Sequence, residues 1–300
     1  MQLIGRGEEE IEVRTPNREL TEKEFREYNI RSNKNIGSWD MDILANSFDT
    51  SDLIEWGFNE NELFGYKDKG LIDDDEVPEV KETTSKTGDL WLLDSHRLLV
   101  GDATKKEDVE KLIQGERIDM VFTDPPFDLE IEKVIKAYDI ISLFNPKISF
   151  WMGSDKQIIL LCNHDFKNLT RIFIHDWKSP TLISNTQPMA QSSLIAKFKN
   201  RNINNLFDGF STILSIPTTK TSSEHKIFSQ GKRVELPFQF IIHYSDRGDN
   251  VLDVFGGYGS TLIACEKTQR RCFMLELEPQ WVDLIIARWE AYTGQKAVLK

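Results

Sequence analysis

Cysteine and histidine are scarce in this sequence, and long apolar runs are missing. Its 300 residues include three cysteines and five histidines. An odd number of cysteines without metal-ligand spacing is typical of a reducing cytoplasm. The histidines form no pair with metal-ligand spacing, and no apolar stretch approaches the roughly 20 residues that a membrane helix needs. The polar amino terminus does not resemble a signal peptide, so we expect a cytoplasmic protein without a metal or a membrane segment.

Positive charge is also in deficit, but only in one part of the chain. The formal net charge is −12, and residues 1–99 account for it with 24 acidic and 12 basic side chains. Residues 166–233 carry ten basic side chains against three acidic ones. Because salt screens charges beyond about 8 Å, such a stretch can bind phosphates although the whole chain is acidic. An ordinary solvated surface is the alternative. The candidate phosphate contacts are Lys197, Lys199, Arg201, Lys220 and Lys226.

Two short apolar runs end abruptly in turns that look functional. Residues 118–123 lead into Asp124-Pro125-Pro126-Phe127, and residues 251–254 lead into a glycine-rich stretch. In an open α/β sheet, ligands bind at the carboxyl ends of the strands. The two turns therefore predict a shared site in which one holds a cofactor and the other a substrate.

The first turn suits an acceptor that carries an exocyclic amino group. The lone pair of such an amino group on a nucleobase is delocalised into the ring. An enzyme must therefore accept hydrogen bonds from the amino hydrogens to localise the lone pair on nitrogen. The Asp124 carboxylate or the Pro125 carbonyl can accept hydrogen bonds from these hydrogens, because the two consecutive prolines fix the backbone with the Pro125 carbonyl pointing outward. Phe127 offers a flat face on which a base drawn out of a duplex can stack. A plain turn that closes a strand is the alternative.

The second turn is suited to a nucleoside. Gly256, Gly257 and Gly259 let the backbone approach a ligand, and Ser260-Thr261 can begin a helix. A dinucleotide site needs a third glycine three residues after Gly259, where Leu262 stands, and this argues against a pyrophosphate cofactor. Glu276 directly follows the next predicted strand, residues 272–275. Its carboxylate can accept hydrogen bonds from both hydroxyls of a ribose. Alternatively it charges the start of a helix predicted over residues 279–292.

These motifs together resemble the amino-group DNA methyltransferases of the permuted (beta) class, in which the catalytic turn precedes the cofactor turn. Asp253, Phe255, Gly256, Gly259 and Thr261 match the family's first motif, and Asp124 to Phe127 match its catalytic tetrapeptide. Gly101-Asp102 and the element from Lys232 to Leu236 resemble two further motifs. The resemblance implies S-adenosylmethionine as the cofactor. The cofactor residues that it implies are Asp102, Lys232, Asp253, Phe255, Gly256, Gly257, Gly259, Ser260, Thr261 and Glu276.

The catalytic residues implied are Asp124, Pro125, Pro126 and Phe127. Asp at the first of these positions resembles the adenine-N6 enzymes, whereas cytosine-N4 enzymes usually carry Ser there. Cytosine-C5 chemistry needs a cysteine nucleophile beside a proline, and none of the three cysteines has that neighbour. We therefore expect a site-specific methyltransferase for adenine N6 in double-stranded DNA. The alternatives are a cytosine-N4 or RNA methyltransferase, or an inactive DNA-binding accessory protein.

The chain divides by composition into three parts. Residues 1–70 look acidic and helical, and they resemble the tail of a ParB-like module found ahead of phage and prophage modification methylases. Residues 71–88 read as a linker, and residues 89–300 as the methyltransferase domain. Within it, residues 200–231 form a polar insertion, which is a candidate target-recognition segment and favours a short site or a homodimer. The expected fold is α/β: a Rossmann-like S-adenosylmethionine-dependent methyltransferase sheet with helices on both faces.

Overall fold

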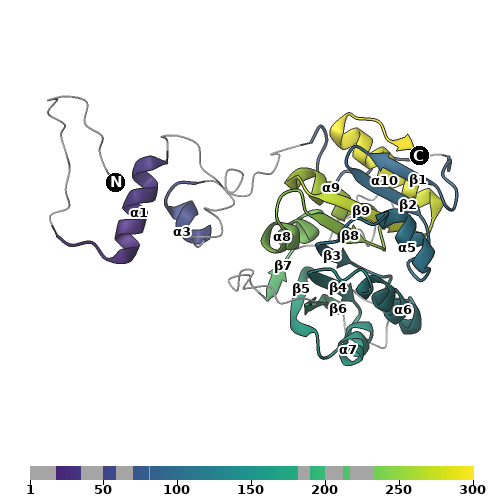
Figure 1. Cartoon of the computed structure of the whole chain (residues 1–300), viewed down its shortest axis with the longest axis horizontal. Coiled ribbons are helices and arrows are strands. Elements are labelled where there is room, and N and C mark those ends of the chain that lie inside the picture. The colour runs from purple at the N-terminus through teal and green to yellow at the C-terminus, as the bar shows by residue number, and fades with distance from the viewer. Residues whose placement is uncertain are drawn as a thin grey trace. The chain divides into compact units, whose positions relative to one another are not determined.

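The computed structural model describes residues 18–34, 50–58, 70–80, 82–181, 190–199, 212–216 and 233–300. The chain forms two compact units, residues 1–64 and residues 65–300 (Figure 1). No helix within the described ranges is long and apolar enough to cross a membrane.

The first unit holds two described helices, α1 (Glu22–Asn33) and α3 (Thr50–Glu55). Thr21 caps α1: its hydroxyl accepts a hydrogen bond from the Glu24 backbone, and the Glu24 carboxylate accepts one from the Thr21 backbone. This reciprocal box satisfies two backbone N–H groups that lack helical partners. The assignment of residues 1–70 as one acidic helical region stays a prediction.

The second unit is built on one sheet, which has ten strands within the described residues. Their spatial order is β10-β1-β2-β9-β8-β3-β4-β6-β5-β7. The strands are β1 (Leu90–Leu93), β2 (His96–Val100), β3 (Met120–Thr123), β4 (Ile148–Gly153), β5 (Leu169–Thr181), β6 (Ala190–Lys199), β7 (Ile213–Ser215), β8 (Asn250–Asp253), β9 (Arg271–Glu276) and β10 (Val298–Leu299).

The centre of this sheet is parallel. Strands β2, β9, β8, β3 and β4 run in one direction, while β1 and β6 pair antiparallel at either side of them. β3 and β8 are neighbours although Thr123 and Asp253, their last residues, are 130 positions apart in the chain. Because the carboxyl ends of parallel strands share one edge, the turns that follow β3 and β8 meet there.

Helices cover both faces of the sheet (Figure 1). Side chains of a strand alternate between faces, so Val121 packs into one core cluster with Val109, Val134 and Leu161, while Phe122 faces the Phe240 ring on the other side. The first face carries α5 (Lys106–Ile113), α6 (Ile131–Ser142) and α7 (Asp155–His164), and the second carries α8 (Glu235–Tyr244), α9 (Ser260–Thr268) and α10 (Pro279–Thr293). The expected α/β fold is confirmed.

The segment 71–88, predicted as a linker, is bonded to the second unit along its length. We call its described residues, 70–80 and 82–88, the strap. Leu71 donates its backbone N–H to the Tyr292 carbonyl, and Ser85 donates its hydroxyl to Asp283 of α10 at 2.5 Å. Near the end of the strap, the Gly88 N–H bonds the Val100 carbonyl. Two of its acids form ion pairs within the second unit, Asp74 with Lys267 and Asp75 with Arg233.

The polar insertion predicted over residues 200–231 lies mostly outside the described residues. Of its described part, residues 213–215 form β7, which pairs parallel with β5 at the sheet edge. Target recognition by this segment stays a prediction.

Candidate functional site

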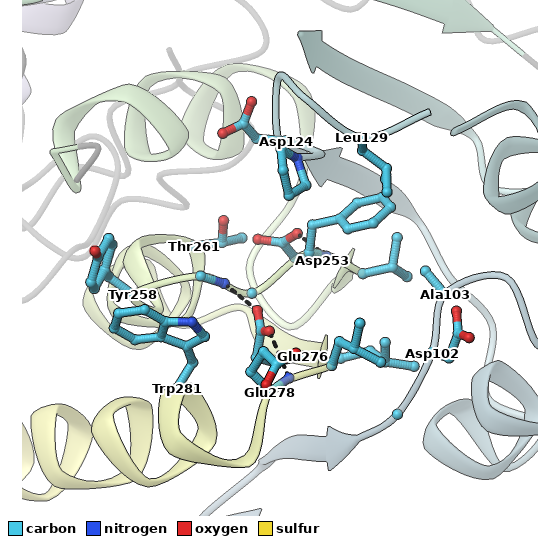
Figure 2. Close-up of a pocket in the computed structure, with 18 of the residues that line it drawn as sticks. Asp102, Ala103, Asp124, Leu129, Asp253, Tyr258, Thr261, Glu276, Glu278 and Trp281 are labelled. Atoms are coloured by element: carbon cyan, nitrogen blue, oxygen red, sulfur yellow. Dashed lines mark hydrogen bonds between the residues drawn. The ribbon is translucent and has the colours of Figure 1, made fainter. Parts of the chain in front are cut away.

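A cavity of about 550 Å³ opens at the carboxyl ends of β2, β3, β8 and β9 (Figure 2). It brings together most of the predicted site residues from both turns. Those that line it are Asp102, Asp124, Pro126, Asp253, Phe255, Gly256, Gly257, Ser260, Thr261 and Glu276. Across the described residues, no group of three or more His, Cys, Asp or Glu side chains is arranged to hold a metal ion.

The catalytic turn is held from below by a residue that the sequence did not single out. Gln157, buried at the start of α7, donates from Nε2 to the Pro126 carbonyl at 2.9 Å and to the Leu129 carbonyl at 3.0 Å. Its Oε1 accepts hydrogen bonds from the backbone and hydroxyl of Ser154. With its amide fixed in this way, Gln157 sets the path of the chain from Pro126 to Leu129.

Two of the predicted catalytic residues do not line the cavity. Phe127 is 44% exposed, and Pro125 lies within the turn without reaching the cavity surface. Pro126 and Leu129 supply the cavity wall at this turn instead.

The catalytic and cofactor turns are joined by one buried contact. The Thr123 hydroxyl donates to Asp253 Oδ1 at 2.8 Å and accepts from the Val254 N–H at 3.2 Å. The same carboxylate oxygen accepts from the Phe255 N–H at 3.1 Å. Thr123 is fully buried and Asp253 is 4% exposed, so water does not compete for these bonds. Asp253 therefore orders both turns as well as lining the cavity.

The glycines of the cofactor turn have different reasons to be glycine. Gly257 has φ +52° and donates its N–H to Glu276 Oε2 at 2.7 Å. A Cβ on Gly256 would lie 2.9 Å from Met274 Cγ. Gly259 has φ +76°, and a Cβ there would lie 3.1 Å from Ile285 of α10. Gly259 does not line the cavity, so backbone conformation and packing on α10, not close approach to a ligand, require it.

Glu276 is a buried carboxylate at the floor of the cavity. It is 8% exposed, and its two oxygens accept the N–H groups of Gly257 and of Glu278, the latter at 3.0 Å. Burial raises the pKa of Glu276, although these backbone donors act in the opposite direction. A carboxylate has about four acceptor positions, so Glu276 keeps acceptor capacity for a ribose hydroxyl beside its backbone donors. The residue thus fits the nucleoside role predicted for it.

An aromatic pair beside Glu276 was not predicted. The Tyr258 and Trp281 rings lie edge to face with centroids 4.9 Å apart, and both line the cavity (Figure 2). Trp281 stands in the first turn of α10, directly after the strand that ends at Glu276. This position in the sequence could have identified Trp281 as a site residue, because a side chain there projects toward the strand ends. Flat apolar surface of this kind suits a purine ring.

Asp102 lies at the opposite wall from this aromatic pair. Its Oδ1 accepts the backbone N–H and the hydroxyl of Thr104, both at 2.8 Å. Its own N–H donates to Asp108 at 2.9 Å, and the preceding Gly101 N–H donates to the Glu276 carbonyl at 2.9 Å. These bonds fix the loop after β2 against the end of β9.

The predicted phosphate contacts that the structure describes lie away from the cavity. Lys199 pairs with Ile148, the first residue of β4, so it stands at the opposite edge of the sheet. The Lys197 ammonium lies 4.5 Å from the centroid of the Tyr244 ring, where it packs over α8. Arg201, Lys220, Lys226 and the predicted cofactor residue Lys232 lie outside the described residues.

Comparisons with known proteins agree with this geometry. Residues 154–287 match the N6_N4_Mtase family model, described as DNA methylase. The matched range includes the cofactor turn and Glu276 but begins after the catalytic turn. The comparison with curated proteins finds no match.

Solved DNA methyltransferase structures share the fold. The M1.HpyAVI–SAM complex superimposes with a TM-score of 0.52 at 17% identity, covering 64% of this chain and 97% of that chain. The PvuII DNA methyltransferase, which is cytosine-N4-specific, gives 0.53 at 16% identity and covers 74% of this chain and 89% of that one. TTHA0409 from Thermus thermophilus, complexed with S-adenosyl-L-methionine, gives 0.50 at 19% identity with coverages of 67% and 96%.

Proposed function

We propose that this chain, which carries a domain of the N6/N4 DNA methylase family, transfers a methyl group from S-adenosylmethionine to the N6 amino group of adenine in DNA. One observation carries the proposal. Asp124, from the turn suited to an amino group, and Glu276, from the strand suited to a ribose, line the same cavity. Neither turn alone indicates group transfer between two bound molecules, but their convergence does.

The cofactor half of the cavity fits a nucleoside. Glu276 accepts the ribose hydroxyls, and the rings of Tyr258 and Trp281 give an apolar wall for the attached base. When bound, S-adenosylmethionine supplies an electrophilic methyl group on a sulfonium ion. The carboxylates of Asp102, Asp253 and Glu276 line this half, and they favour a cation over a neutral ligand.

The acceptor half of the cavity fits an amino group. The Asp124 carboxylate accepts a hydrogen bond from the amino group of the target base and so keeps the lone pair of the amino nitrogen directed at the methyl group. Gln157 fixes the turn on which Asp124 stands, so the carboxylate is oriented before the base arrives. The exposed Phe127 ring stacks on the base that has left the duplex. Positioning and hydrogen bonding are therefore the main contributions of the chain to catalysis.

Cytosine N4 is the second candidate acceptor. It presents the same kind of amino group, and the cytosine-N4-specific PvuII enzyme shares this fold. Asp at position 124 favours adenine, because the resemblance noted from sequence associates cytosine-N4 enzymes with Ser there. Both acceptors use the same cavity and the same carboxylate.

Expression of the full chain in a methylation-free bacterium tests the proposal. Single-molecule sequencing of the host DNA then reports which base is modified and in which context. We expect N6-methyladenine in a short motif, and its loss with Asp124→Ala. Asp139→Ala is the matched control, because this exposed carboxylate of α6 does not line the cavity. Modified cytosine would select the second candidate, and unmodified DNA from a well-folded, well-expressed chain would contradict both.

A further inference from the structure

We propose that the strap helps to form the cofactor site. It fixes the side chain of Arg288, and Arg288 fixes the cofactor turn at Tyr258. Arg288 is a positioning residue in this scheme, and it lies behind the cavity wall. The inference rests on the proposed function, since the turn that Arg288 holds is the one assigned to S-adenosylmethionine.

Arg288 bridges two segments that are far apart in the chain. From α10, its NH1 donates to the Tyr258 carbonyl at 2.6 Å, and its NH2 donates to the Asp74 carbonyl at 2.7 Å. The side chain is 2% exposed. The planar guanidinium offers two nitrogens at a fixed angle, so one side chain serves both carbonyls. A lysine ammonium carries its donors on a single nitrogen and lacks this fixed geometry.

The strap supplies the negative charge that a buried guanidinium needs. Asp73, Asp74 and Asp75 form a tight turn there, in which the Asp75 N–H donates to Asp73 at 2.9 Å. Burial lowers the pKa of Arg288 to about 10, and the three carboxylates oppose that shift. The guanidinium is therefore charged at neutral pH, and its hydrogen bonds are of the strong, charge-assisted kind.

This acidic turn is itself anchored on three helices. The Asp74 carboxylate accepts the Lys267 ammonium of α9 at 2.6 Å and the Tyr292 hydroxyl of α10 at 3.1 Å. The Asp75 carboxylate accepts the Val234 N–H at the start of α8 at 2.8 Å. These contacts fix the strap relative to α8, α9 and α10. Because Arg288 is bonded to both the strap and Tyr258, they also restrain the position of Tyr258.

The cofactor turn is consequently held from two sides by one helix. Trp281, one turn into α10, packs against the Tyr258 ring, and Arg288 binds the Tyr258 carbonyl further along the same helix. Tyr258 lies between Gly257 and Gly259, both with positive φ, where the backbone has the most freedom. Fixing a carbonyl in such a turn reduces the entropy that ligand binding must otherwise remove.

Arg270 provides a matched control. It is also buried, at 5% exposure, and it also donates to two backbone carbonyls, of Thr268 at 2.7 Å and of Ser245 at 2.5 Å. It precedes β9 and therefore lies at the amino end of the strands, across the sheet from the cavity. Arg288→Lys and Arg270→Lys should both lower stability, but only the first should disturb the cofactor turn.

The experiment compares these two variants with wild type in the full chain, using hydrogen–deuterium exchange and calorimetry. Without ligand, amides of residues 254–261 should exchange about tenfold faster in Arg288→Lys and at the wild-type rate in Arg270→Lys. Unchanged exchange of this turn in folded Arg288→Lys would overturn the inference whatever the ligand is.

Titration with S-adenosylmethionine supplies the second measurement. Arg288→Lys should bind it roughly ten- to a hundredfold more weakly, as expected for the loss of a charge-assisted hydrogen bond, and Arg270→Lys should bind it like wild type. Equal weakening in both variants would show that Arg288 acts only through stability and would also overturn the inference. If wild type itself did not bind S-adenosylmethionine, the proposed function would fail, while the exchange data would still decide the role of Arg288.

Discussion

Thr123 and Asp253 join the catalytic turn to the cofactor turn through a 2.8 Å hydrogen bond between the ends of two adjacent strands. Each residue is the last of its strand, and each is buried. The contact sets the distance between the two halves of the cavity, which methyl transfer requires to be constant. A change in this pair should therefore affect both halves at once.

Thr123→Val is expected to lower stability by about 1–3 kcal/mol, because it removes one of the hydrogen bonds to Asp253 Oδ1 and takes the Thr123 acceptor away from the buried Val254 N–H. It should also weaken cofactor binding and slow turnover together. Denaturant unfolding and calorimetry measure the two effects. Thr268→Val is the control, since Thr268 is equally buried but bonds only within and at the end of α9. Cofactor affinity and turnover like those of wild type in folded Thr123→Val would contradict the coupling.

Gln157→Glu should slow turnover by at least about tenfold and leave cofactor affinity within a few-fold of wild type. The substitution keeps the size of the side chain but replaces its two N–H donors with an acceptor facing the carbonyls of Pro126 and Leu129. The catalytic turn should then shift while Glu276 stays in place. Steady-state kinetics under saturating cofactor gives kcat, and calorimetry gives the affinity. A large loss of cofactor affinity with a normal kcat would show that Gln157 supports the cofactor turn, which would contradict its assignment to the catalytic turn.

Cofactor affinity should fall as the pH is lowered through the pKa of Glu276, which burial raises above its usual value. Above that pKa the group is a carboxylate and accepts ribose hydroxyls, whereas below it a proton occupies one acceptor position. The folding stability of the protein without cofactor depends on pH in the opposite sense. A raised pKa favours the protonated folded form, so the stability that this group contributes is present at acid pH and is lost as the pH rises through the pKa of the folded state. Glu276→Gln should bind weakly and without this pH dependence. An identical pH profile in the variant would assign the titration to another group.

Removal of the strap should abolish cofactor binding, contrary to what the composition of residues 71–88 suggested. A chain beginning at residue 65 should bind S-adenosylmethionine like the full chain, and a chain beginning at residue 89 should not. The shorter chain loses the partners of Asp283, Lys267 and Arg288. Circular dichroism and thermal unfolding establish that each chain is folded before titration. Full affinity in a folded chain that begins at residue 89 would show that the strap is dispensable.

The sequence predicted those features that depend on neighbouring residues. The apolar runs before Asp124 and Phe255 are β3 and β8, and Glu276 does end a strand at the cavity, because short buried strands followed by turns have a strong local pattern. Gln157 and Arg288 escaped prediction because their partners, Pro126 and Asp74, are distant in sequence. The linker was read from acidic composition, which carries no information on the Lys267 and Arg288 that neutralise it.

The position of basic side chains relative to the cavity was not readable from the sequence. Lys197 and Lys199 belong to a basic stretch, but the antiparallel pairing of β6 with β4 turns Lys199 toward the edge opposite the cavity. Strand direction within a sheet depends on tertiary pairing and is not readable from a run of basic residues. Gly259 shows the same limit, since its need for glycine comes partly from Ile285 on another element.

Transfer of a labelled methyl group tests the central claim most directly. The full chain is incubated with S-adenosylmethionine carrying a deuterated methyl group and with unmethylated double-stranded DNA, and the nucleosides are then analysed by mass spectrometry. We expect label in N6-methyladenine, formed by wild type and by Arg270→Lys but not by Asp124→Ala. Absence of label from DNA, or equal labelling by the Asp124→Ala variant, would contradict it.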